Sequence, residues 1–135
     1  MKTGNDKIRR DALTQREAMT MKIVWDHNKP ISAVEIQQEL AERYGISYER
    51  STITTFILHL RQKGFIDSYK KGQIHYYVPI VSEAEYIADQ TRQFADFWFG
   101  GSAAKMIAAY ASDDNGGISE KEVDEIRRII DDLDR

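Results

Sequence analysis

The stretch STITTFILHLRQKGF, residues 51–65, is the part of the sequence that best indicates the fold. On a helical wheel of about 100° per residue, its large apolar residues fall on one side, which predicts a helix that packs inward there. The inward residues are Ile53, Phe56, Ile57 and Leu60. The opposite side, which we call the outer strip, consists of Ser51, Thr55, Leu58 and Gln62. Its two edges are formed by Thr54 with Arg61 and by Thr52 with His59.

The outer strip and its edges hold no acidic residue, although 30% of the chain is charged and its net charge is −3. A helix face selected only for solubility normally carries Asp or Glu. Hydroxyl and amide side chains hydrogen-bond to base edges, and an apolar side chain such as Leu58 can contact a thymine methyl group. The sequence therefore predicts a DNA-contacting helix that uses Arg50, Ser51, Thr52, Thr54, Thr55, Leu58, His59, Arg61 and Gln62. An ordinary Thr-rich surface, or burial against a partner protein, is compatible with the same pattern.

A β-hairpin is predicted directly after this helix, in FIDSYKKGQIHYYVP, residues 65–79. Residues that favour β-structure lie on both sides of a basic turn formed by residues 70–73, and the segment ends at Pro79. Within that turn, Lys70 and Lys71 are candidates for contacts with DNA phosphates. A hairpin beside a DNA-contacting helix has the docking geometry of a wing.

Helix starts are predicted by capping boxes, in which a Ser or Thr is followed three residues later by Glu. Two boxes, at residues 14–17 and 32–35, open helices that reach about residues 25 and 44, and two more lie at 82–85 and 119–122. A further short helix is expected from Ser102 to about Ala111. The fold class is therefore mainly α: a winged helix-turn-helix of three helices and a hairpin over residues 1–80, then a helical dimerisation region over residues 81–135.

The two regions differ in charge and in how they can bury apolar residues. Residues 1–80 carry 13 Lys and Arg against 9 Asp and Glu, whereas residues 81–135 carry 6 against 13, so only the first region is suited to a polyanion. The helices of the second region have one apolar face but are too thin to bury it alone. We expect that face to meet a second subunit, through Phe94, Trp98, Val123, Ile126, Ile130 and Leu133.

Composition and spacing argue against several other classes of site. The chain has no cysteine, which excludes disulfides and thiol chemistry, and its three histidines lack metal-ligand spacing. Residues 111–122 resemble a calcium-binding loop, with Asp113 and Asn115 at ligand positions, but Ala111 stands where the first ligand is needed. No catalytic constellation is evident. The sequence thus predicts a cytoplasmic protein that is not an enzyme and has no metal or other cofactor.

Several motifs together resemble the penicillinase-repressor family. They are LTQREAMTMKIVW at 13–25, STITTFILHLRQKGFI at 51–66, FGGSAAKMIAAYA at 99–111 and ISEKEVDEIRRIIDDLD at 118–134. The resemblance implies a homodimeric repressor that binds an inverted-repeat operator in double-stranded DNA. In several members of the family, a pathway that includes a membrane sensor-protease ends repression by cleavage in the C-terminal part. The matching bond here is Ala109–Tyr110.

The sequence departs from the family's pattern at three places. His59 stands where members often carry Arg, Ala109–Tyr110 replaces an Asn–Phe pair, and the cysteine motif of the copper-responsive branch is missing. Two alternative functions are a winged-helix regulator that responds directly to a small ligand and a winged-helix module that binds protein.

Overall fold

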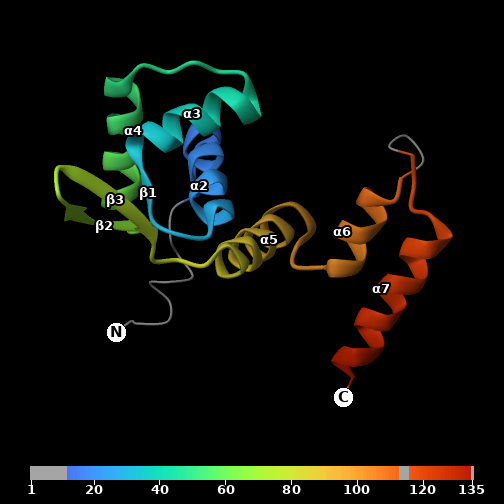
Figure 1. Cartoon of the computed structure of the whole chain (residues 1–135). Coiled ribbons are helices and arrows are strands. Elements are labelled where there is room, and N and C mark those ends of the chain that lie inside the picture. The colour runs from blue at the N-terminus through green and yellow to red at the C-terminus, as the bar shows by residue number, and fades with distance from the viewer. Residues whose placement is uncertain (1–11, 113–115, 135) are drawn as a thin grey trace, which may run out of the picture. The chain divides into compact units, whose positions relative to one another are not determined.

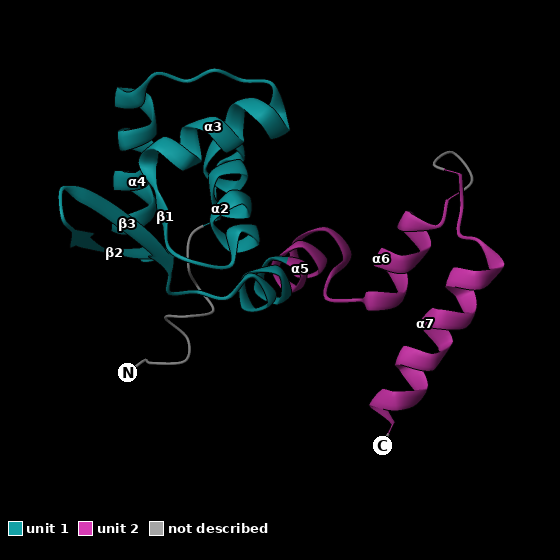
Figure 2. Ribbon diagram, viewed as in Figure 1, with its two compact units in different colours: residues 1–90 teal, residues 91–135 magenta. Residues whose placement is uncertain are grey.

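The computed structural model describes residues 12–112 and 116–134. The chain forms two compact units, one ending at Gln90 and the other beginning at Thr91 (Figure 2). The element order is three helices with a small sheet, followed by three further helices (Figure 1).

The first two helices begin at the predicted capping boxes. Helix α2 spans Gln15–His27 and is capped by Thr14 with Glu17, and helix α3 spans Ala33–Tyr44 and is capped by Ser32 with Glu35. Each helix ends at a residue in the left-handed region, Asn28 and Gly45, with φ values of 62° and 69°. Residues of this kind end helices because Gly and Asn tolerate positive φ. The predictions of both helices are confirmed.

Helix α4 spans Arg50–Gln62 and includes most of the quoted stretch. It has no side-chain cap; the backbone N–H groups of Thr52 and Ile53 donate to the Glu49 carbonyl at 3.0 and 3.1 Å. The four inward residues of the wheel are all buried, and none is more than 8% exposed. The prediction of the inward side is therefore confirmed.

The sheet has three antiparallel strands in the order β1-β3-β2. Strand β1 spans Ile31–Ser32, β2 spans Ile66–Lys71 and β3 spans Ile74–Pro79. Lys71 pairs with Ile74, so the turn consists of only Gly72 and Gln73. The sequence-based placement of both lysines in the turn was wrong, because the β2–β3 pairing extends up to Lys71. Strand β1 was not predicted at all.

The core of the first unit lies where α2, α3 and α4 meet the sheet. Met21, Ile36, Leu40, Ile53 and Leu60 are all completely buried. Four tyrosines, a tryptophan and other partly buried residues pack against this cluster. The first unit is thus a winged helix with its own hydrophobic core.

Helix α5, Glu83–Phe99, begins on the first unit and is bound there by several specific contacts. The Trp25 indole Nε1 donates to the Val81 carbonyl at 2.8 Å, just before the helix starts. The Tyr86 ring packs edge-on against Phe65 at 5.3 Å between centroids, and its hydroxyl accepts a 2.8 Å hydrogen bond from the Leu13 backbone N–H. The first turns of α5 therefore belong to the winged-helix unit.

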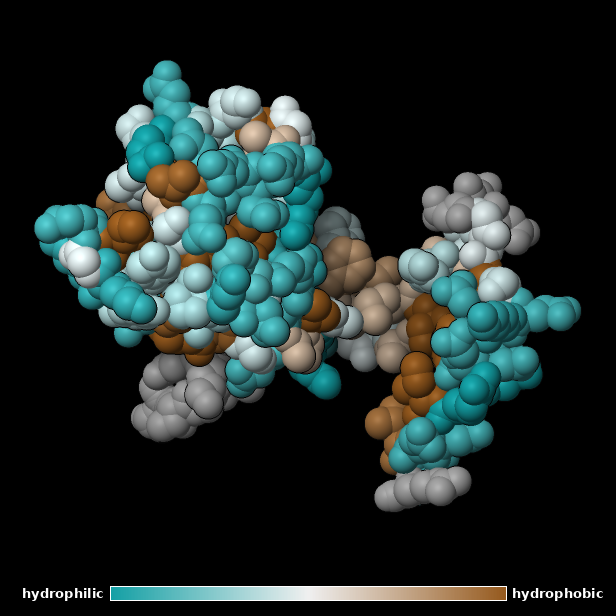
Figure 3. Space-filling model, in the orientation of Figure 1, coloured by the Kyte–Doolittle hydropathy of each residue, from teal (hydrophilic) through white to brown (hydrophobic). Residues whose placement is uncertain are grey.

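The second unit consists of the rest of α5, helix α6 at Ala103–Tyr110 and helix α7 at Glu120–Leu133. Helices α6 and α7 begin at Ser102 and Ser119, whose hydroxyls accept hydrogen bonds from the N–H groups three residues later. Neither helix contains a buried residue. Figure 3 shows hydrophobic side chains gathered along one side of α7. Apolar residues in this unit are therefore exposed in the single chain.

Candidate nucleic-acid interface

The outer strip of α4 is exposed along its whole length. Ser51, Thr55 and Gln62 are exposed, and Leu58 is 51% exposed. At the edges, Thr54, His59 and Arg61 are exposed, whereas Thr52 is half-buried. The structure thus brings the predicted residues of this helix together on one accessible face without an acidic side chain.

The hydroxyl groups of Thr54 and Thr55 have a defined hydrogen-bonding capacity. Each donates its proton to the carbonyl one turn earlier, that of Arg50 at 3.0 Å and that of Ser51 at 3.1 Å. A hydroxyl whose proton is used in this way still has an oxygen that accepts hydrogen bonds. In the major groove, adenine N6 and cytosine N4 are the donors such an oxygen can pair with. This pair of threonines is therefore equipped to read amino groups on base edges.

Arg50, at the start of α4, is held by a residue that the sequence did not point to. Its Nε donates a hydrogen bond to the Gln37 side-chain oxygen at 3.3 Å. The Gln37 amide nitrogen in turn donates to the Tyr48 carbonyl at 2.8 Å. A guanidinium has five N–H donors in a planar fork, so the other donors of Arg50 can still be directed at a phosphate. Gln37 carried no signal in the sequence, because its partners are 11 and 13 residues away.

The wing presents its two lysines on opposite faces. Lys70 pairs with His75 across the hairpin, and Lys71 pairs with Ile74. Because successive strand residues point to opposite sides of a sheet, Lys70 and Lys71 leave the wing in opposite directions. The Lys71 side also carries Tyr69 and Tyr76, whose rings stack at 5.9 Å. Both lysines are exposed.

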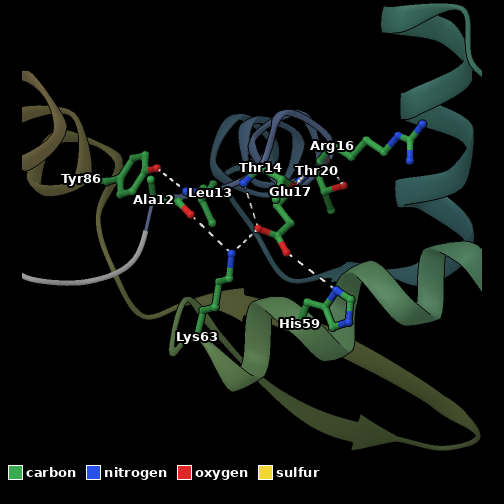
Figure 4. A network of polar contacts seen from close by, with 9 residues as sticks. All are labelled: Ala12, Leu13, Thr14, Arg16, Glu17, Thr20, His59, Lys63 and Tyr86. Carbon is green, nitrogen blue, oxygen red and sulfur yellow. Dashed lines mark hydrogen bonds and ion pairs between the residues drawn. The ribbon is translucent and has the colours of Figure 1, made fainter. Parts of the chain in front are cut away.

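His59 is directed toward α2. Its Nδ1 lies 3.7 Å from the Glu17 Oε2, and Lys63 Nζ lies 2.6 Å from the Glu17 Oε1 (Figure 4). Burial raises the pKa of the Glu17 carboxyl, but hydrogen bonds from Lys63 and the Thr14 backbone outweigh it and hold that pKa below its usual value. The sequence indicates Glu17 only as a capping residue, and nothing in it singles out Lys63.

An open groove of about 480 Å³ lies beside these contacts. It runs between the first turn of α2 and the His59 edge of α4. The lining residues are Thr14, Gln15, Arg16, Glu17, Thr55, Phe56 and His59.

The residues predicted to form a subunit interface lie in the second unit. The rings of Phe94 and Trp98 are 6.4 Å apart, and the two side chains are 51% and 65% exposed. On α7, Val123 and Ile126 are half-buried, whereas Ile130 and Leu133 are exposed. Ile129, 60% exposed, lies on the same face, three residues after Ile126, and was missed by the sequence analysis although its spacing could have revealed it.

Two predicted features remain: the bond between Ala109 and Tyr110 and the calcium-loop pattern of residues 111–122. Ala109 and Tyr110 form the end of α6 and are exposed. Asp113 and Asn115 of the calcium-loop pattern lie outside the described residues. Over residues 12–112 and 116–134, no cluster of three His, Asp or Glu side chains is arranged to hold a metal ion. In the same ranges, no helix combines the length and apolarity that crossing a membrane requires.

The three-helix core, the hairpin and the exposed polar helix α4 together define a winged-helix protein. Residues 13–132 match the model of the penicillinase repressor family. The chain belongs to that family, as the resemblance of its motifs predicted.

The relatives agree with this assignment. A penicillinase repressor from Bacillus licheniformis is 26% identical over 118 residues, which cover 87% of this chain and 88% of that protein. The methicillin resistance regulatory protein MecI of Staphylococcus aureus (strain N315) is also 26% identical and matches over 87% of this chain and 92% of its own length.

Among solved structures, the DNA-binding domain of the repressor BlaI matches with a TM-score of 0.50 and 28% identity. The match covers 58% of this chain and 92% of that domain. A complex structure of hsRosR-S4, at 14% identity and a TM-score of 0.53, shares the fold only.

Proposed function

We propose that the protein is a DNA-binding transcriptional repressor whose helix α4 lies in the major groove of its operator. The observation that carries this proposal is the exposed, acid-free outer strip of α4. A relative named as a penicillinase repressor, a relative named as a regulatory protein and the similarity to the DNA-binding domain of BlaI support it. In this arrangement, Thr54, Thr55 and Leu58 contact base edges, while Arg50 and Arg61 contact phosphates near the two ends of the helix.

The wing adds phosphate contacts beside the recognition helix. Lys70 and Lys71 leave the hairpin on opposite faces, so each is suited to a separate phosphate. Such contacts set affinity and orientation without reading sequence. Thr52 is half-buried and His59 is directed toward Glu17, so we place the specific contacts on the outer strip and on Thr54 at its other edge.

The repressor acts as a homodimer on an inverted repeat. The supporting observation is the set of apolar side chains of α5 and α7 that stay exposed among the described residues of the second unit. A two-fold dimer presents two copies of α4 about one helical turn of DNA apart, or a multiple of it, which matches the symmetry of an inverted repeat. Binding of the second half-site is then intramolecular and raises affinity by roughly 10²–10⁴.

Repression is relieved by proteolysis in the second unit, through a membrane sensor-protease pathway. Cleavage between Ala109 and Tyr110 separates α7, and with it Ile129, Ile130 and Leu133, from the rest of the chain. Since α7 holds much of the exposed apolar face, its removal weakens the dimer and the operator complex together. The exposure of Tyr110, 69%, supports access to this position.

Selection of binding sites from a random double-stranded library tests the central proposal. The protein is incubated with the library, bound DNA is recovered over several rounds, and the enriched duplex is compared with a scrambled duplex of equal composition. We expect an enriched inverted repeat that binds at least a thousand times more tightly than the scrambled duplex. Failure to enrich any sequence would refute the assignment of α4 as a sequence-reading helix.

A further inference from the structure

Glu17 is a buried carboxylate that receives contacts from two helices. It lies in the first turn of α2 and is only 4% exposed. Its Oε1 accepts hydrogen bonds from the Thr14 backbone N–H at 3.0 Å and from Lys63 Nζ at 2.6 Å. Its Oε2 lies 3.7 Å from His59 Nδ1 (Figure 4). One carboxylate therefore joins the start of α2 to His59 of α4 and to Lys63 at the C-terminal end of that helix.

These contacts exceed what a helix cap needs. In the capping box that opens α5, Glu85 accepts hydrogen bonds from the backbone and hydroxyl of Ser82 and is exposed. Glu17 has the equivalent place in its own box but is buried and reaches across 46 residues of sequence to Lys63. The additional contacts of Glu17 connect α2 to the recognition helix.

Lys63 is fixed at both of its ends. Its backbone N–H donates to the carbonyls of His59 and Arg61, which makes it the C-cap of α4. Its ammonium group also donates to the Ala12 carbonyl at 3.3 Å, three residues before α2 begins. His59 and Lys63 are one helical turn apart, so they lie on the same edge of α4. Glu17 thus contacts both His59 and Lys63, which lie one turn apart at the C-terminal end of α4.

Such a group controls orientation better than it adds stability. The hydrophobic effect is non-directional, so slightly different rotations of α4 about its axis bury similar apolar areas. A buried ion pair offsets most of its own desolvation cost, and its best-attested role is to fix one arrangement. Charge-assisted hydrogen bonds of this kind are short and directional. The Glu17 contacts therefore oppose rotation of α4 about its own axis.

A small rotation matters for reading bases. With side chains, a helix has a radius of about 5–6 Å, so a turn of about 20° moves the outer strip by about 2 Å. Hydrogen bonds to base edges need donor–acceptor distances of about 2.7–3.2 Å and do not survive that shift. Flexible lysines on the wing can follow a phosphate over the same distance. Rotation thus removes sequence preference before it removes general affinity.

We propose that Glu17 is a positioning residue for sequence recognition, acting through Lys63 and His59 to set the rotation of α4. The proposal rests on the proposed function, in which α4 reads bases. It also gives His59 a role other than direct base contact: the imidazole stands at the edge that α2 holds, where its ring nitrogen faces the carboxylate.

The test compares binding to the selected operator duplex with binding to the scrambled duplex, for the full chain in each case. Glu17→Gln keeps the shape of the side chain and removes its charge. Lys63→Met removes the ammonium group at a partly exposed position, which makes it the safer variant for folding, and Lys63→Arg restores a cation. Glu85→Gln is the matched control, because it alters the same kind of capping box away from α4. Circular dichroism and melting identify folded proteins, and binding is measured well below the lowest melting temperature.

We expect Glu17→Gln and Lys63→Met each to reduce the ratio of operator to scrambled affinity by about fivefold or more, the loss of at least one base contact. The combined variant should lose little beyond either single one, because both remove the same link. Lys63→Arg and Glu85→Gln should keep the ratio of the unaltered chain.

Lower melting temperatures with an unchanged ratio would overturn the proposal and leave Glu17 a purely structural residue. Equal weakening on both duplexes would overturn it as well. If the unaltered chain itself shows no preference between the duplexes, the proposed function fails and this inference falls with it.

Discussion

Replacing two apolar residues of α7 is expected to separate the proposed dimer without unfolding the chain. The change is Ile130→Gln together with Leu133→Gln. In the single chain these side chains are 48% and 79% exposed, so the fold of one subunit makes little use of them. Gln is also a good helix former, so α7 should persist.

The magnitude follows from the area that the dimer would hide. The exposed fractions of Ile130 and Leu133 add up to about one and a quarter side chains per subunit. A two-fold dimer that covers them would therefore bury about two and a half side chains. Full burial of a Leu or Ile side chain contributes about 2 kcal/mol. The double variant should therefore weaken association by about 5 kcal/mol, which is between three and four powers of ten in the dissociation constant.

Sedimentation equilibrium over a range of protein concentrations measures that constant directly. Ile80→Gln is the matched control, because Ile80 is 59% exposed but lies in the first unit, outside the proposed interface. We expect the control to dimerise like the unaltered chain. A double variant that dimerises normally, or a control that dissociates as strongly, would refute the assignment of α7 as the dimer interface.

Four further predictions concern DNA binding and stability. Lys70→Ala with Lys71→Ala should weaken binding to the operator and to the scrambled duplex alike, and should make the slope of log affinity against log salt shallower by about 2, at about 0.9 per phosphate contact. Filter binding at several salt concentrations measures the slope. A loss of affinity confined to the operator would contradict the role of the wing. Thr55→Ala should cost about 1–3 kcal/mol on the operator and little on the scrambled duplex, as fluorescence anisotropy can determine. Because its pKa is lowered in the folded chain, Glu17 should stabilise the fold fully above about pH 4.3 and lose that contribution as the pH falls through its folded-state pKa. Urea unfolding at a series of acidic pH values should show that the free energy of unfolding falls less steeply with pH for Glu17→Gln. An unchanged pH dependence would contradict the lowered pKa. A fragment of residues 1–109 should keep the melting transition of the first unit, sediment as a monomer and lose tight operator binding; retention of full operator affinity would argue against relief of repression by cleavage.

Local patterns predicted the helices of the first unit well. A capping box needs residues only three apart, so Thr14 and Ser32 fixed two helix starts without knowledge of the fold. The inward side of α4 followed equally from helical spacing. The order of three helices and a hairpin then predicted the winged-helix arrangement, and the family resemblance implied the same one.

The wing shows where a local pattern stops being sufficient. The segment KKGQ is compatible with a four-residue basic turn or with a two-residue turn between longer strands. The pairing of Lys71 with Ile74 selects the shorter turn, and that choice decides which face each lysine occupies. Because strand side chains alternate with a period of two, an error of one residue in register exchanges the two faces.

Contacts between distant residues could not be predicted at all. Glu17 and Lys63 are 46 residues apart, and Leu13 and Tyr86 are 73 apart. Nothing in the neighbourhood of either pair signals the other member. The buried carboxylate became apparent only when α2 and α4 were placed side by side, so the residue that we propose to orient the recognition helix was first identified as a cap.

The two units also differ in what stabilises them, and that difference bears on how the repressor is switched. The first unit buries a continuous cluster of apolar side chains, whereas α6 and α7 contain no buried residue. A helix with an exposed apolar face gains most of its stability from tertiary packing, and short isolated helices are marginal in water. If that packing comes from a second subunit, the order of the second unit depends on association, and association depends on an intact α7. A single cut near Ala109 then needs no effect on the recognition helix to end repression, because the loss of the partner already removes the linked second half-site.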